Sequence, residues 1–248
     1  MKTDQAFIES DNVPWTSVNE NISMKLLNGL ADSGPYTAIL KSEPRPPDPH
    51  RGQYHAVDEE FYCLGGLFTF DGTHWFRKGS YVHFPPHYVH GARVHVEQGY
   101  LLYLRISGTV TTDFVEKPTS SSPYLLEGAT SCMEHTVHQR VSLRGRNVNT
   151  HGGSGLKSRL LKVHPHTGEG TTLLNWASHT SARRISLVSE KELEIFVLSG
   201  KFESEPGKML QQGSYAFLSG ETVEVPLCAE SAGRVLVSHG STLNVDVE

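Results

Sequence analysis

The chain has 248 residues, of which 37% are hydrophobic and 20% charged, and its formal net charge is −5 with its 14 histidines neutral. This composition excludes disordered and fibrous proteins, and Lys and Arg form no cluster dense enough to follow a phosphate backbone. No stretch approaches the ~18 apolar residues of a membrane helix. We therefore expect a globular protein that acts on a small molecule, with neither nucleic acid nor membrane as a partner.

The N-terminus and the cysteines indicate the compartment. Met1–Ser10 is mostly polar and lacks the apolar segment of a secretion signal. Cys63, Cys132 and Cys228 lie far apart and form no CxxC pair, which argues against a disulfide framework and against a Cys-rich zinc site. We expect a cytoplasmic protein whose chemistry is to be sought first among its histidines.

Short β-branched and aromatic runs, separated by Gly, Pro, Asp or Ser, dominate the first half of the chain. Phe61–Phe70, Ser80–Phe84 and Tyr100–Ile106 are such runs, and each predicts a strand. No amphipathic pattern of a dozen or more residues predicts a long helix. Val115–Pro123 is rich in Thr, Ser and Pro, which is typical of a linker. The pattern predicts an all-β protein built as an antiparallel sandwich or barrel.

A repeat with one constant offset relates the two halves of the sequence. Gly79–Tyr81 recurs as Gly213–Tyr215, and 213 − 79 = 134. Three further segments reappear at this offset: Lys25–Leu27 as Arg159–Leu161, Thr37–Leu40 as Thr171–Leu174, and Glu60–Gly66 as Glu194–Gly200. Chance likeness between strands would scatter the offsets, so we predict two copies of one small β-fold.

Two motifs in the first copy concentrate histidine and glutamate. The first spans Gln53–Gly66 and the second spans Gly79–His90. They resemble the two cupin motifs, in which HxH, three residues, Glu, six residues and Gly form the first, and Gly, five residues, PxG, two residues and His form the second. The resemblance covers residues 20–108 well and the second copy weakly. It implies two tandem cupin barrels of the double-stranded β-helix, or jelly-roll, type.

The resemblance carries the metal ligands of the family onto His55, Glu59 and His90, while Gln53 stands where the family has its first histidine. Strand alternation places residues 53 and 55 on one face, so both can point into a barrel. Two imidazoles and one carboxylate suit one divalent metal ion, with Fe(II) preferred and Zn(II), Mn(II) or Ni(II) as alternatives. Gln53 is either a weaker fourth ligand or a hydrogen-bonded side chain, and His50 is the other candidate for the fourth position. Taken singly, each of these residues would be structural.

Other side chains are candidates for a substrate pocket. Arg105 could hold an anionic substrate near the barrel mouth, although a salt bridge is the commoner role of such an arginine. Tyr103 and Trp75 are expected either as pocket walls or as core. His83 and His87 either support the ligands or are exposed. The sequence assigns no catalytic residue, and no cofactor is expected beside the metal.

The second copy has lost the predicted ligands. At the offset of 134, Gln53, His55, Glu59 and His90 correspond to Leu187, Ser189, Leu193 and Glu224. Two aliphatic side chains at ligand positions predict an interior that is filled as core. We expect residues 1–115 to form an N-terminal cupin with a metal site, 116–150 a linker, and 151–248 a degenerate cupin without metal ligands.

The residues around the motifs resemble two groups of cupins with different functions. Asp58–Gly66 and Gly79–Pro85 look like the acetylacetone-dioxygenase-like cupins and like the zinc-binding domain of the ChrR-type anti-sigma factors. The first group implies a non-haem Fe(II) dioxygenase or related oxidoreductase acting on a small oxygen-rich or dicarbonyl-like molecule, with isomerase and C–C lyase chemistry open to the same ligands. The second implies a non-catalytic zinc-binding sensor or regulatory module. The enzyme is favoured because no N-terminal helical sigma-binding domain is expected. The resemblance also implies pairing of barrels, in a homodimer or within one chain.

Overall fold

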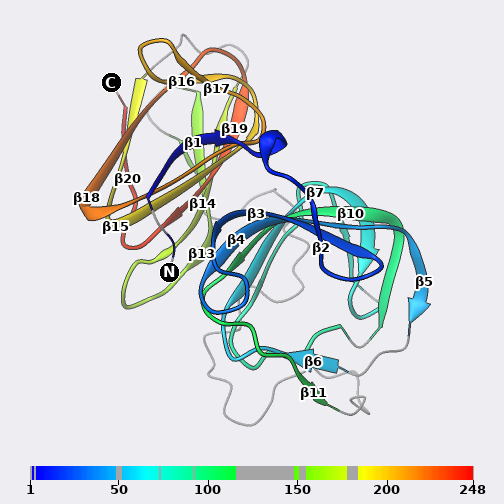
Figure 1. Ribbon diagram of the computed structural model, residues 1–248. Coiled ribbons are helices and arrows are strands. Elements are labelled where there is room, and N and C mark those ends of the chain that lie inside the picture. The colour runs from blue at the N-terminus through cyan, green and yellow to red at the C-terminus, as the bar shows by residue number, and fades with distance from the viewer. Residues whose placement is uncertain are drawn as a thin grey trace. The chain divides into compact units, whose positions relative to one another are not determined.

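The computed structural model describes residues 2, 4–48, 52–72, 74–91, 93–115, 148–150, 155–177 and 184–247. Within these residues the chain consists of strands and one short 3-10 turn, η1 (Ser10–Asn12), and contains no α-helix (Figure 1). In the same part of the chain, no helix is long and apolar enough to cross a membrane. The all-β prediction is confirmed. Most of the expected linker lies outside the described residues, but its last three residues form a strand, β12 (Val148–Thr150).

The described residues divide into two compact units. One contains Pro14 to Val115, and the other contains Asp4 to Val13 together with Val148 to Val247. The first strand of the chain therefore belongs to the C-terminal unit, which differs from the expected N-terminal domain of residues 1–115. Hydrogen bonds account for this placement, because β1 (Gln5–Glu9) pairs antiparallel with β18 (Ser214–Ala229) in that unit.

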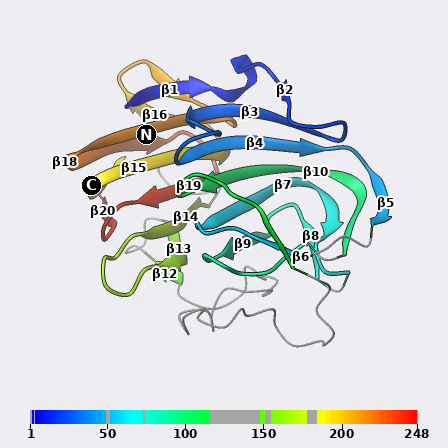
Figure 2. The same ribbon diagram turned by 60° about the horizontal axis from the view of Figure 1, so that its bottom comes forward.

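The first unit is an antiparallel sheet in the order β2-β3-β4-β10-β7-β8. β5 also pairs with β10, β9 also pairs with β7, and β6 and β11 form a separate two-stranded ladder. Both views show β3, β4 and β10 running side by side (Figures 1 and 2). The strands are β2 (Thr16–Ser17), β3 (Ile22–Gly29), β4 (Tyr36–Ser42), β5 (Arg45–Asp48), β6 (Gly52–Tyr54), β7 (Glu59–Thr69), β8 (Trp75–Arg77), β9 (Tyr81–Phe84), β10 (Val94–Ile106) and β11 (Asp113–Val115).

Strand alternation sorts the side chains of the first unit onto two faces. Leu104 of β10 lies opposite Phe61 of β7, and both belong to the apolar core. The neighbouring pair, Arg105 and Glu60, therefore stands on the other face of the sheet. The core is rich in aromatic rings, and burying them is the main source of stability for a sheet of this kind. Its buried members are Phe61, Cys63, Phe68, Phe76, Val82, Phe84, Tyr88, Val94, Val96, Tyr100, Leu102, Leu104 and Ile106.

The second unit repeats this plan with the sheet order β12-β13-β14-β19-β15-β18-β16-β17, to which β1 and β20 are added. Its core is mostly aliphatic, with Trp176 and Phe202 as its buried aromatic members, and includes Leu187 and Leu193, both fully buried. The strands not yet named are β13 (Leu156–Val163), β14 (Gly170–Trp176), β15 (Arg184–Ser199), β16 (Phe202–Glu205), β17 (Lys208–Leu210), β19 (Gly233–His239) and β20 (Asn244–Val247).

The offset of 134 holds in the structure as well as in the sequence. β3 and β13 begin at residues 22 and 156, and β4 and β14 begin at 36 and 170, so both pairs differ by 134. Equivalent backbone hydrogen bonds also recur, from Gly79 N to Cys63 O at 2.8 Å and from Gly213 N to Val197 O at 2.9 Å. Two units with the same strands and the same bonds confirm the tandem arrangement.

A buried side-chain contact is duplicated too. The hydroxyl of Tyr81 donates to Glu60 Oε2 at 2.5 Å, and the hydroxyl of Tyr215 donates to Glu194 Oε1 at 2.7 Å. Each tyrosine follows its glutamate by 21 residues in both units. A buried carboxylate needs such partners to offset its loss of hydration, so this contact belongs to the common scaffold of the two units.

Candidate metal centre

Backbone pairing brings the two motifs of the first unit together. His55 follows β6, and Glu59 is the first residue of β7. Gln53 and His90 exchange two backbone hydrogen bonds, each 2.8 Å long, and His87 N donates to His55 O at 2.7 Å. These bonds attach the second motif to the strand that leads into His55. The three predicted metal ligands therefore lie at one place although 35 positions separate the first from the last in the sequence (90 − 55 = 35).

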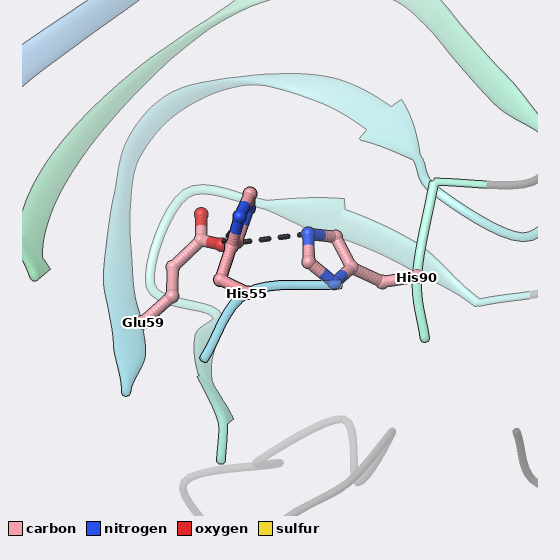
Figure 3. A group of neighbouring side chains, drawn as sticks. All are labelled: His55, Glu59 and His90. Carbon is pink, nitrogen blue, oxygen red and sulfur yellow. Dashed lines mark ion pairs between the residues drawn. The ribbon is translucent and has the colours of Figure 1, made fainter. Parts of the chain in front are cut away.

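The three side chains converge on one point (Figure 3). The Nε2 atoms of His55 and His90 lie 3.5 and 3.4 Å from Glu59 Oε2. One ligand atom from each residue lies within 4.8 Å of the others. Ligand atoms bound at ~2.1 Å to one tetrahedral or octahedral ion are about 3.0 to 3.4 Å apart, so the spacing suits a shared ion.

Backbone carbonyls orient both imidazoles. His55 Nδ1 lies 3.1 Å from Thr111 O, and His90 Nδ1 lies 3.1 Å from Tyr88 O. A carbonyl accepts only, so each Nδ1 carries a proton, and Nε2 is the ring nitrogen that faces Glu59 and can bind a metal ion. In metal-binding histidines, such a hydrogen bond from the ring nitrogen that does not bind the metal fixes the tautomer.

Glu59 supplies a buried negative charge. Burial raises the pKa of the Glu59 carboxyl, but the imidazoles of His90 and His55 outweigh this and hold the pKa below its ordinary value of 4.5. Its Oε2 is buried and has no hydrogen-bond partner among the described residues. An ionised oxygen without a donor is costly inside a protein, and a cation between it and the two Nε2 atoms would satisfy it.

Aromatic rings close one side of the group. Phe84 stacks on His90 with ring centroids 4.3 Å apart and an interplanar angle of 7°, and Tyr88 stacks on Phe84. Phe84 and Tyr88 are almost completely buried. Because these rings keep water away from one flank, charges at the site interact more strongly than they would in water.

Comparison with known proteins supports the architecture. The family model described as ChrR cupin-like domain matches residues 3–108. A candidate dioxygenase of Nostoc punctiforme aligns with a TM-score of 0.70 at 14% identity, over 98% of this chain and 85% of its own. Residues 3–108 therefore match a cupin domain, and the likeness to this solved structure extends the shared fold over almost the whole chain. Oxalate decarboxylase of Bacillus subtilis aligns with a TM-score of 0.58 at 10% identity, over 97% of this chain and 78% of its own. That of Lactobacillus farciminis also has a TM-score of 0.58, at 9% identity, over 99% and 88%. No curated protein sequence matches.

The fourth predicted ligand position is Gln53. Its backbone pairs with His90, and its side chain packs over Gly91, where an added Cβ would lie 3.4 Å from Gln53 Cγ. Ligation by Gln53 therefore stays a prediction. The alternative, His50, lies outside the described residues.

The three predicted pocket residues stand on the other face of the sheet. Arg105 and Glu60 form an ion pair on this face, and Tyr103 lies opposite Tyr62 in the ladder between β10 and β7. Trp75 precedes the core residue Phe76 in β8 and contacts the ring of His95 at 5.2 Å. Strand alternation places these side chains on the face opposite Glu59, where Tyr103 is buried, so the structure does not bring them to the metal group.

His83 and His87 are not part of the group either. His83 Nε2 lies 2.5 Å from Asp58 Oδ1, and His83 faces Glu60 in the ladder between β7 and β9. It therefore shares the outer face with Glu60. His87 has a positive φ of 65° and contacts the ring of Tyr54 at 5.7 Å.

A tyrosine on the inner face was not predicted from the sequence. Tyr36 begins β4 and lies opposite Ile106, which in turn lies opposite Glu59. Burial, and next the charge of Glu59, raises the pKa of Tyr36 to about 12. One signal could have identified it. The offset of 134 leads from Tyr36 to Gly170, so this side chain is lost in the same copy that lost the ligands.

An arginine on the inner face was also missed. Arg45 of β5 lies opposite the core residue Val96. Its Nε is buried and has no hydrogen-bond partner in the described part of the chain. Burial raises the pKa of the nearby Tyr100 hydroxyl, Arg45 opposes this rise and Glu59 adds to it. Tyr100 is therefore within electrostatic reach of both charges.

The second unit has no such group among its described residues. Leu187 and Leu193 are fully buried in its core, as expected for a filled interior. Ser189 Oγ lies 3.2 Å from Ser241 Oγ, and Glu224 is exposed. The predicted loss of the ligand positions from the second copy agrees with these placements.

Proposed function

We propose that this cupin is a metal-dependent enzyme, a non-haem Fe(II) dioxygenase acting on a small oxygen-rich or dicarbonyl-like molecule. The convergence of two imidazoles and one carboxylate carries this proposal, because a triad of these ligands leaves coordination positions open for substrate and O2. The printed description of the Nostoc punctiforme protein as a candidate dioxygenase supports the same chemistry.

Each residue of the site would have its own role. His55, Glu59 and His90 would hold the ion, which when bound supplies Lewis acidity and one-electron chemistry. The carbonyls of Thr111 and Tyr88 keep the two Nε2 atoms turned toward Glu59. Glu59 would neutralise part of the charge of the ion. The ring of Phe84 excludes water from the flank of His90.

A non-catalytic zinc module is the second candidate function. The match of residues 3–108 to the ChrR cupin-like domain favours it. A structural or sensing zinc site is closed by four protein ligands, so Gln53 or His50 would have to complete it. An open three-ligand site binds exogenous ligands and a closed one does not. This difference separates the two candidates.

The test combines metal analysis with oxygen consumption. We expect about one divalent ion per chain after purification, and we expect the Fe(II)-loaded protein to consume O2 with at least one of acetylacetone, catechol and related compounds. His90→Ala should remove the metal and the O2 uptake while the fold is kept. His164→Ala, which changes an exposed histidine of the second unit, should alter neither. Stoichiometric metal in His90→Ala would contradict the site, and metal without any O2 uptake would contradict the dioxygenase.

Location and assembly are proposals from the sequence. We place the chain in the cytoplasm, which suits the free thiols of Cys63 and Cys228. Pairing of two chains is proposed from the family resemblance. Fractionation and light scattering of the purified protein test these two points.

A further inference from the structure

We propose that Tyr36 is a substrate-binding residue that donates a hydrogen bond to an anionic oxygen at the metal centre, so that the site selects small enolates or carboxylates. This inference rests on the proposed metal-dependent function. It adds a substrate class to that function and a residue outside the ligand set.

The first support is the position of Tyr36. Directly opposite residues of antiparallel strands present their side chains on the same face. Tyr36, Ile106 and Glu59 lie opposite one another on three neighbouring strands, so they form one row across the inner face. Tyr36 also packs against the apolar core of the first unit. The phenol thus lies two strands away from the carboxylate of the metal group and faces the same interior.

The second support is that the Tyr36 hydroxyl is available as a donor. It makes no hydrogen bond to another described residue. Burial and the charge of Glu59 raise its pKa to about 12, so it stays protonated at physiological pH. A half-buried neutral O–H group without an acceptor is well suited to bind an oxygen of the substrate.

The charge of the interior favours an anion. A divalent ion beside the single carboxylate of Glu59 leaves a net positive charge. Arg45 adds a second one, because its side chain lies on the inner face and its Nε has no partner in the described residues. The charges of Arg45 and Glu59 both act on the pKa of the Tyr100 hydroxyl, which burial raises, so both charges are felt in one region of the interior. A neutral substrate would leave this positive charge uncompensated, whereas an enolate or carboxylate would balance part of it.

The second unit provides an internal comparison. Its equivalent of Tyr36 is Gly170, since 36 + 134 = 170. A Cβ at Gly170 would lie 2.3 Å from Lys162 O and 3.1 Å from His239 Cε1, so no side chain fits there. The phenol and the metal-binding side chains are present in one copy and absent from the other. A residue needed only for the common scaffold would be expected in both.

The experiment uses the full chain loaded with Co(II), whose visible absorption reports changes in coordination. Acetohydroxamate is the probe, because it binds metals through two oxygens as an anion. Tyr36→Phe removes one oxygen atom and keeps the ring. We expect this variant to bind Co(II) like the wild type and to bind acetohydroxamate about tenfold more weakly, as for the loss of one hydrogen bond to a charged oxygen.

Two controls make the result specific. Tyr81→Phe removes the same atom from a tyrosine on the other face of the sheet, and it should leave acetohydroxamate affinity unchanged. Imidazole binds Co(II) through nitrogen and is neutral, so Tyr36→Phe should bind it like the wild type. Equal acetohydroxamate affinity in Tyr36→Phe and wild type would overturn the role of Tyr36. Equal weakening of both probes would overturn the selection of anions. Failure of the wild type to bind Co(II) would instead overturn the proposed metal centre.

Discussion

Glu60 and Tyr81 form a buried hydrogen bond of 2.5 Å on the face of β7 opposite the metal group. Glu59, one residue earlier, points into the interior. Two adjacent carboxylates of one strand therefore have different tasks, one in the scaffold that both units share and one in the candidate metal centre. The contrast yields paired predictions.

Substituting Glu59 and Glu60 by glutamine, one at a time, should separate the effect on metal binding from the effect on stability. Glu59→Gln removes the anionic ligand, so we expect metal affinity to fall more than about 100-fold while the fold is kept. Glu60→Gln weakens the ion pair with Arg105, so we expect a lower free energy of unfolding and normal metal content. Metal titration and urea unfolding measure the two effects. Loss of metal in Glu60→Gln alone would contradict the assignment of faces.

Removing the phenol oxygen of Tyr81 or of its counterpart Tyr215 should destabilise the protein. Each hydroxyl donates to a buried glutamate, and a hydrogen bond to a charged group contributes about 1.5 to 3 kcal/mol. We expect Tyr81→Phe and Tyr215→Phe each to lower the free energy of unfolding by that order, as measured by urea denaturation. Effects below about 0.5 kcal/mol in both variants would show that neither contact belongs to the stabilising scaffold.

Neighbouring glycines of β7 should respond differently to alanine. Gly66 has a φ of 97°, and a Cβ there would lie 2.1 Å from Gly99 O. Gly65 has no atom within 4 Å of an added Cβ. We expect Gly66→Ala to cost about 2 kcal/mol or more and Gly65→Ala to cost less than about 1 kcal/mol. Thermal unfolding of the two variants would measure this, and similar losses in both would contradict the predicted difference.

Acid should destabilise the metal-free protein partly through Glu59. The pKa of this carboxyl is lower in the folded protein than its ordinary value of 4.5. Its stabilising effect is therefore fully present above pH ~4.5, and it is lost as the pH falls through the folded pKa. We expect the unfolding free energy of Glu59→Gln to fall less steeply below pH ~4.5 than that of the wild type. Parallel curves for the two proteins, measured after chelation, would contradict this.

Much of the fold could be predicted from the sequence because the strand pattern of the first half recurs in the second. The constant offset identified two copies, and the spacing of His55, Glu59 and His90 identified the side chains that the structure brings together. The aliphatic residues at Leu187 and Leu193 predicted the filled interior of the second unit. These inferences depended only on spacing and residue type.

Strand faces and distant pairings could not be predicted in the same way. A bulge shifts the register between Val96 and Tyr100 of β10, and a shift of one residue exchanges the two faces of a strand. The parity of Tyr103 and Arg105 was therefore open. Tyr36 lies in one row with Glu59 only because β4 pairs with β10 and β10 pairs with β7. β1 pairs with β18, near the other end of the sequence. Local spacing in the sequence encodes neither of these pairings.

The paired backbone bonds between Gln53 and His90 have a consequence for how the site fills. Because main-chain bonds hold the two motifs together, the spacing of the ligands is a property of the fold, and the bound ion does not create it. The empty site should act as a rigid chelator that releases and regains its ion without unfolding. Exchange of one metal for another should then depend on which ions the surroundings offer.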